Sequence, residues 1–267
     1  MLHPDNNNLR TTSPLKLPAD IDWRHWVERW DRMQERYLVR RAERVALIVG
    51  LIQETVDPVS HVLDLGCGTG TLMEPMLQTF PAAEIHGIDF DPVLLPLAQE
   101  RLRSHGARAH LHLTDLRAEG WPEQLPGSFD AVVSATALHW FTEAELAGLY
   151  RQLTRVLRPG GLFLNADHVG SRQPKVQAFW ERNRDVMRRN EGKHNGEDWD
   201  RFWEAYARAL GLAGQRRITE RVLGGWAGGV EEGLPLEWHV NQLKANGFTH
   251  IDCFWRCDCD AIYGGFH

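Results

Sequence analysis

Short apolar runs alternate with amphipathic segments along the middle of the chain. The apolar runs predict five strands, over residues 61–65, 84–89, 107–113, 129–134 and 162–166. Between and beside them, apolar residues recur three and four positions apart, which predicts helices over 69–80, 92–105 and 142–157. This regular alternation of strand and helix is typical of a parallel sheet with helices on both faces.

The segment before the first strand is amphipathic as well. Residues 22–56 predict one long helix, because Trp26 and Trp30 share a helical face and an apolar stripe continues beyond them. Asp57-Pro58 ends this helix, since the residue before a proline disfavours helical backbone. Residues 1–20 hold several prolines and the run NNN, so we expect a flexible leader there.

The pattern changes after the fifth strand. Residues 173–222 are charged, rich in tryptophan and helical in pattern, and GGWAGGVEEG at 224–233 predicts a loop. A further helix is predicted over 235–246. Two alternating runs, 250–256 and 259–266, are joined too closely for a parallel crossover, so they predict an antiparallel hairpin.

These elements divide the chain into five parts. We expect a leader (1–20), an N-terminal helical cover (21–56), a cofactor-binding core (57–170), a helical lid that binds the acceptor (171–235), and a C-terminal helix with a hairpin that completes the core sheet (236–267).

Composition and charge exclude several classes of partner. The 267 residues are 43% hydrophobic and 25% charged, which is ordinary for a globular protein. A net charge of −6 gives no global field that favours nucleic acid or anionic membranes. There is no apolar run of membrane-spanning length and no secretory leader, and the cysteines form no disulfide framework, so we expect a cytoplasmic protein. The cysteine spacing fits no common zinc pattern, and we expect no metal.

The stretch LDLGCGTG, residues 63–70, holds the strongest chemical signal. Its G-x-G-x-G spacing differs from the G-x-G-x-x-G of dinucleotide sites, and it lacks the lysine of a phosphate-binding P-loop. Asp64 would repel a pyrophosphate, but it suits the ammonium of the methionine moiety of S-adenosylmethionine (SAM). The stretch therefore favours SAM over NAD, and a NAD-dependent oxidoreductase stays as the rival.

Two further acids follow predicted strands. Asp89 ends the second strand and is placed to accept both ribose hydroxyls, a feature that suits NAD as well as SAM. Asp115 follows the third strand and is placed to accept a hydrogen bond from the adenine amino group, with Leu116 beside the ring. Alternatively, Asp115 caps a loop.

Several motifs together resemble those of class I SAM-dependent methyltransferases. They are LDLGCGTG, GIDFD, the Asp115-Leu116 pair, FDAVVSATALHW and RVLRPGG, and they cover residues 56–168 in order. The resemblance implies an α/β fold with a doubly wound, Rossmann-like sheet of seven strands, mostly parallel, whose reversed strand the C-terminal hairpin supplies. It also implies that the three loop glycines flank the methionine part and that Ala135 lies on the open side of the cofactor.

In such enzymes the N-terminal helix often closes over the cofactor. Tyr37 and Arg40 are then placed to reach the methionine carboxylate, or else they belong to a solvated helix face. The residues expected at the cofactor are Tyr37, Arg40, Asp64, Gly66, Cys67, Gly68, Gly70, Asp89, Phe90, Asp115, Leu116 and Ala135.

The acceptor side is less specific. His139, in ALHW after the fourth strand, is a candidate general base or hydrogen-bond orienter, or else part of a local packing motif. Asp167 and His168 form a second candidate pair. The aromatic residues of the cover and insertion either line an apolar pocket or pack helices together. The expected pocket residues are Trp26, Trp30, Trp140, His168, Trp180 and Trp203.

These residues predict in-line transfer of a methyl group from SAM to a small, partly apolar acceptor in a closed pocket, leaving S-adenosylhomocysteine. The alternatives are a catalytically silent SAM-binding regulatory module and a methyltransferase that acts on tRNA or protein. We expect no nucleic-acid or membrane partner. The sequence leaves open whether the chain is a monomer or a homodimer.

Overall fold

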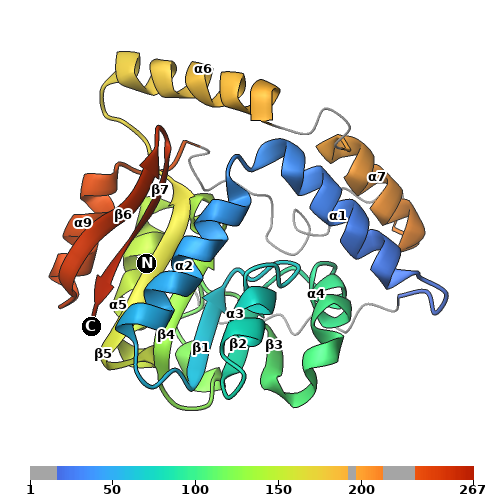
Figure 1. Cartoon of the computed structure of the whole chain (residues 1–267), viewed down its shortest axis with the longest axis horizontal. Helices are drawn as coiled ribbons and strands as arrows, with labels where there is room; N and C mark the ends of the chain where they lie inside the picture. The colour runs from blue at the N-terminus through green and yellow to red at the C-terminus, as the bar shows by residue number, and fades with distance from the viewer. Residues whose placement is uncertain (1–16, 192–196, 213–231) are drawn as a thin grey trace, which may run out of the picture.

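A single seven-stranded sheet forms the centre of the molecule (Figure 1). The computed structural model describes residues 17–191, 197–212 and 232–267. The strand order is β3-β2-β1-β4-β5-β7-β6, and the first five strands of this order run parallel while β7 is antiparallel to both neighbours. The strands are β1 (His61–Leu65), β2 (Glu84–Asp89), β3 (Ala109–Leu113), β4 (Phe129–Ala135), β5 (Leu157–His168), β6 (Thr249–Cys257) and β7 (Asp260–Phe266). The predicted fold class and C-terminal hairpin are confirmed.

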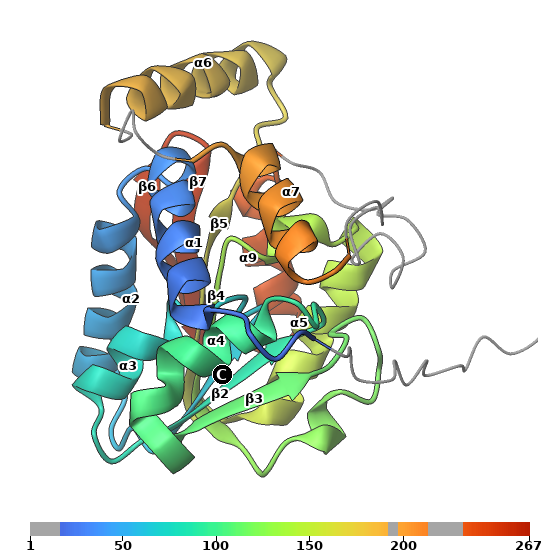
Figure 2. The ribbon, with the colours of Figure 1, turned by 90° about the vertical axis from the view of Figure 1, so that its right-hand side faces the viewer.

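Helices cover both faces of this sheet (Figure 2). They are α1 (Trp23–Tyr37), α2 (Arg41–Thr55), α3 (Met73–Thr79), α4 (Leu95–Leu102), α5 (Glu143–Val156), α6 (Pro174–Glu191), α7 (Trp199–Ala209) and α9 (Leu236–Ala245). Helices α2, α3 and α4 lie on one face, and α5 and α9 lie on the other. Among the described residues, no helix is both long enough and apolar enough to cross a bilayer.

Each face of the sheet has its own apolar core. Ile48 and Ile52 of α2 pack with Met76 of α3 against one face, and Leu149 and Leu153 of α5 pack against the other. The continuous burial of β1 and β4 explains why both strands read as unbroken apolar runs rather than alternating ones.

The predicted single helix over 22–56 is wrong. The structure has two helices there, because the chain turns at residues 38–40 and Arg40 adopts a left-handed conformation with φ 54°. The turn lets α1 pack against α4 and α7 while α2 lies on the sheet (Figure 1). No glycine or proline marks this break, so the tertiary packing of α1 determines it.

Two other helices begin later than predicted. The chain reaches Met73 before α3 starts, because Gly70 first closes a turn onto the Cys67 carbonyl oxygen. The Asp91 carboxylate accepts from the Val93 amide before α4 begins. By contrast, α5 begins within one residue of its predicted start at 142, and Thr142 and Glu145 form a capping box there.

Residues 1–16 of the expected leader and residues 224–231 of the expected loop lie outside the described residues.

Candidate functional site

The glycine loop lies at the carboxyl end of β1, where an open parallel sheet places its ligands. Its three glycines have positive φ angles, +69° at Gly66, +54° at Gly68 and +73° at Gly70. A side chain on Gly66 would come within 2.5 Å of the Ala137 Cβ, whereas one on Gly68 would meet nothing within 4 Å. The loop is thus packed tightly at its first glycine and open at its second.

Two buried acids, Asp64 and Asp89, lie beside the loop. The Asp89 carboxylate accepts from the Gly68 amide and the Asp91 amide, each at 2.8 Å, so it ties the end of β2 to the glycine loop. Burial raises the pKa of Asp89. Both carboxylate oxygens of Asp64 are buried without a hydrogen-bond partner among the described residues. Burial and then the charge of Asp89 raise the pKa of Asp64 to about 8.

An unpartnered buried carboxyl is costly, because the group loses water and gains nothing in return. A cation that entered beside Asp64 would remove that cost and restore the charged form. The site is therefore chemically suited to a ligand that carries a positive group at the first strand's end.

The third predicted acid has a partner of its own. Both Asp115 carboxylate oxygens accept from the Arg117 guanidinium, the shortest contact being 2.6 Å. Burial opposes the effect, but these hydrogen bonds lower the pKa of Asp115. Leu116 is buried in the core under α5, and Ala135 is partly buried at the end of β4. Phe90 is partly buried directly after β2.

The cover residues contact α7 and α6. The Tyr37 hydroxyl accepts from the Trp199 amide at 3.0 Å, and the Tyr37 carbonyl oxygen accepts from the Arg188 side chain at 3.1 Å. Arg40 is exposed at the turn between α1 and α2. The cover helix is thus joined to the inserted helices at its carboxyl end.

Arg101 of α4 joins α1 to the glycine loop, a role that the sequence did not reveal. Its Nε donates to the Thr69 carbonyl oxygen at 2.9 Å, within the glycine loop. Its Nη2 donates to both carboxylate oxygens of Asp31 in α1, also at 2.9 Å. An arginine on an exposed-looking helix gives no sequence signal for such a bridge.

His139 and Asp167 form the second centre of the site. The Asp167 carboxylate accepts from the His139 amide at 2.9 Å and from its Nδ1 at 2.7 Å. Both side chains are buried, at 6% and 2% exposure. Burial alone would raise the pKa of Asp167, but the charge and hydrogen bond of His139 lower it. A carboxylate at Nδ1 fixes the tautomer and leaves Nε2 for proton transfer.

His168 completes this group. Its ring lies 4.8 Å from the His139 ring, centroid to centroid, and its Nδ1 is 2.8 Å from the Asp260 carboxylate. The sequence predicts Asp167 and His168 as a pair, but the structure pairs Asp167 more closely with His139. The two partners are 28 positions apart, and only the register of β4 against β5 brings them together.

The expected pocket tryptophans separate into three places. Trp140 is 40% exposed, and its ring lies 4.6 Å from that of His139. Trp26, Trp30 and Trp203 pack with Phe202 of α7 in one aromatic cluster between α1 and α7. Trp180 of α6 contacts the Arg256 guanidinium, 4.6 Å from the ring centroid.

Comparison with known proteins agrees with this geometry. Residues 62–161 match the family model of a methyltransferase domain. Malonyl-[acyl-carrier protein] O-methyltransferase of Brevibacillus brevis is 28% identical over 213 residues, which are 80% of this chain and 63% of that protein. Trans-aconitate 2-methyltransferase of Deinococcus radiodurans is 36% identical over 43% of this chain and 42% of its own length.

The fold comparison covers more of the chain. An O-methyltransferase family protein from Burkholderia thailandensis superposes on 90% of this chain and 68% of its own, with a TM-score of 0.54 and 16% identity. The chain spans less than two thirds of the first curated relatives that it matches. Residues 62–161 therefore match a methyltransferase domain, and the sheet has the fold of the class I methyltransferases, whose cofactor is SAM.

Proposed function

We propose that this protein transfers a methyl group from SAM to a small organic acceptor. The observation that carries the proposal is the buried carboxyl of Asp64, which has no hydrogen-bond partner in the part of the chain that the structure describes. Asp64 lies in β1, the strand that leads into a glycine loop that is open at Gly68. SAM supplies a sulfonium methyl group that is already activated, so the protein has to bind, orient and exclude water rather than form a covalent intermediate.

The cofactor roles follow from chemistry and position. Asp64 is suited to the ammonium of the methionine part, and Asp89 to the ribose hydroxyls, since its carboxylate has acceptor capacity beyond the two backbone amides. Asp115 and Leu116 are proposed for the adenine, at the end of β3. Tyr37 and Arg40 are proposed for the methionine carboxylate, and the helix α1 for the cover that excludes water.

The acceptor roles centre on the His139–Asp167 pair. For a hydroxyl acceptor, the oxygen attacks the methyl carbon, the carbon–sulfur bond breaks, and His139 takes the acceptor's proton at Nε2. Asp167 stabilises the imidazolium that results. Trp140 and His168 are adjacent to His139, so we propose them for the wall of the acceptor pocket. The cover tryptophans are proposed to shape the same cavity from a greater distance.

A second candidate is a carboxylate acceptor. The names of two relatives give acids as their acceptors, a malonyl group on an acyl carrier protein and trans-aconitate. A carboxylate is already deprotonated, so its methylation needs no base and would use His139 only as a hydrogen-bond donor.

One experiment separates these candidates. The purified chain is incubated with methyl-labelled SAM and two panels, phenols and alcohols in one and carboxylic acids in the other. The same assay is run with His139→Asn, whose side-chain amide can keep the bond to Asp167 but cannot accept a proton. With a hydroxyl acceptor, turnover should fall by roughly 100-fold or more, with unchanged affinity for S-adenosylhomocysteine.

The other outcomes are equally informative. Equal turnover of a carboxylic acid by wild type and variant would show that His139 does not act as a general base, and it would favour the carboxylate acceptor. A third panel holds tRNA and protein, and label that appears only in this panel would move the acceptor to a macromolecule. Bound cofactor with no transfer to any panel would identify a silent regulatory module and overturn the proposal.

A further inference from the structure

The amino ends of β1, β2 and β3 carry an unusual group of side chains. These amino ends lie opposite the glycine loop, which follows the carboxyl end of β1. In the parallel registers His61 is paired with Glu84, and His86 with His110. Side chains alternate along a strand, so these residues and His112 share one face of the sheet. Four imidazoles and one carboxylate are therefore gathered on three neighbouring strands.

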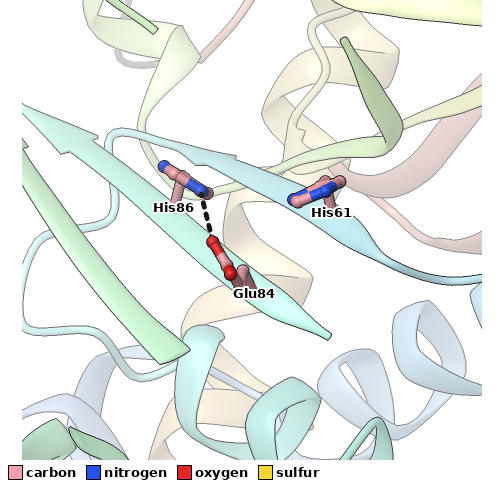
Figure 3. Close-up of side chains that lie close together, drawn as sticks. All are labelled: His61, Glu84 and His86. Atoms are coloured by element: carbon pink, nitrogen blue, oxygen red, sulfur yellow. Dashed lines mark ion pairs between the residues drawn. The ribbon is translucent and has the colours of Figure 1, made fainter. Parts of the chain in front are cut away.

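Three of these side chains converge (Figure 3). Each of His61, Glu84 and His86 offers one ligand atom, and these atoms all lie within 4.8 Å of one another. The His86 Nε2 is 3.9 Å from the nearer Glu84 oxygen, too far for a hydrogen bond. The same Glu84 oxygen is 3.1 Å from the Nε2 of His110.

Two ring nitrogens in this group are buried without partners. The His86 side chain is 2% exposed, and its Nε2 has no hydrogen-bond partner among the described residues. The Nδ1 of His61 is also buried and has no hydrogen-bond partner among the described residues. Buried polar atoms are normally satisfied, and a bound ion is one of the explanations for an exception.

The rest of the group supports the same interpretation. The Nδ1 of His86 lies 3.1 Å from the Nε2 of His112, and this contact orients the ring and aims the other nitrogen at Glu84. Metal-binding histidines typically have their second nitrogen held in this manner.

The backbone beneath these ligands is also fixed. One Asp130 oxygen accepts from the Ser60 amide at 2.7 Å and from the His61 amide at 2.8 Å. The Glu84 amide in turn donates to the Ser60 carbonyl oxygen at 2.9 Å. The starts of β1 and β2 are therefore held in register, which keeps His61 and Glu84 side by side.

We propose that His61, Glu84 and His86 bind one divalent transition-metal ion of the type that prefers imidazole, such as Zn²⁺. Two imidazoles and one carboxylate are a common set for this ion, with water or His110 in the fourth position. Ligand atoms around tetrahedral zinc are about 3.4 Å apart, so the side chains must close slightly. Glu84 is 48% exposed and can make that adjustment.

This site is at the opposite end of the strands from the glycine loop, and it does not depend on the proposed methyl transfer. The sequence predicted no metal, because the ligands come from two separate short strands and their spacing matches no common zinc motif. The ion would join β1 to β2 at their amino ends, so its effect is to stabilise the sheet.

The test uses the full chain, stripped with a chelator and then titrated with Zn²⁺ alone in a calorimeter. We expect one saturable equivalent, a higher Tm with the ion, and tetrahedral absorption bands when Co²⁺ replaces zinc. Glu84→Gln, at an exposed side chain, should weaken zinc binding by about tenfold or more. The double variant with His61→Ala should lose the equivalent.

His25→Ala is the matched control, since His25 is an exposed histidine on α1. It should leave zinc binding unchanged, and all variants should keep the wild-type circular dichroism spectrum. The absence of a saturable equivalent would overturn the proposal. An equivalent that survives both Glu84→Gln and the double variant would overturn it as well, because the ion would then be bound elsewhere.

Discussion

Replacing Asp64 with asparagine should stabilise the cofactor-free protein at neutral pH. Burial and the charge of Asp89 raise the Asp64 pKa from its usual value of 3.8 to about 8. The folded carboxyl therefore holds its proton more tightly than the unfolded one. Stability is highest at low pH and falls as pH rises between about 4 and about 8, because the unfolded state gains by ionising. At pH 7 the raised pKa of Asp64 lowers the free energy of unfolding by on the order of 4 kcal/mol.

The same substitution should weaken cofactor binding. In the proposed site the Asp64 carboxylate bonds the ammonium of the methionine part, and a hydrogen bond between charged groups contributes about 1.5–3 kcal/mol. An amide cannot supply that charge. S-adenosylhomocysteine, which keeps the ammonium, should therefore bind roughly ten- to a hundredfold more weakly to Asp64→Asn.

Urea denaturation between pH 5 and pH 8, followed by tryptophan fluorescence, measures the first effect, and calorimetry measures the second. Wild type should lose stability as pH rises, and the variant should lose much less. Asp115→Asn is the control, because the pKa of Asp115 is lowered and its removal should leave the downward slope in place. Parallel pH profiles for wild type and Asp64→Asn, or unchanged ligand affinity, would contradict the raised pKa of Asp64 or its contact with the ammonium.

Three further predictions concern other parts of the site. Arg101→Ala should weaken S-adenosylhomocysteine binding severalfold in calorimetry, because the substitution removes the bridge between α1 and the glycine loop. Unchanged affinity would contradict that role. Gly66→Ala should lower the free energy of unfolding, measured in urea, by about 2–5 kcal/mol, because the alanine is strained at positive φ and clashes with Ala137. Gly68→Ala should lower it by only about 1–2 kcal/mol, because it has the strain without the clash. Equal losses would be inconsistent with the 2.5 Å approach at Gly66. Asp167→Asn should lower the free energy of unfolding at pH 7 by about 3–5 kcal/mol, measured by urea denaturation. Its folded pKa is lowered, so the stability it contributes is present above about pH 4 and lost as pH falls below, and a pH-independent loss would count against the ion pair.

Much of the fold is readable from the sequence because its signals are local. The buried strands of the parallel sheet are continuous apolar runs, and β1 and β2 begin and end where the sequence predicts. The α5 capping box is a four-residue pattern whose hydrogen bonds form within the segment itself. The break between α1 and α2 has no such signal, because the packing of α1 against α4 and α7 determines it.

The site divides in the same manner. The glycine loop and Asp89 follow predicted strands, and the structure places them side by side. The His139–Asp167 hydrogen bonds depend on how β4 lies beside β5, which no local pattern encodes. Arg101 is missed for the same reason, since its partners lie in other elements.

Calorimetric titration of the purified chain with S-adenosylhomocysteine, with NAD in a parallel titration, shows which cofactor the glycine loop binds. We expect saturable binding of S-adenosylhomocysteine at one site and no binding of NAD. Binding of NAD instead, or binding of neither ligand, would contradict the assignment of the glycine loop and of Asp64 to SAM.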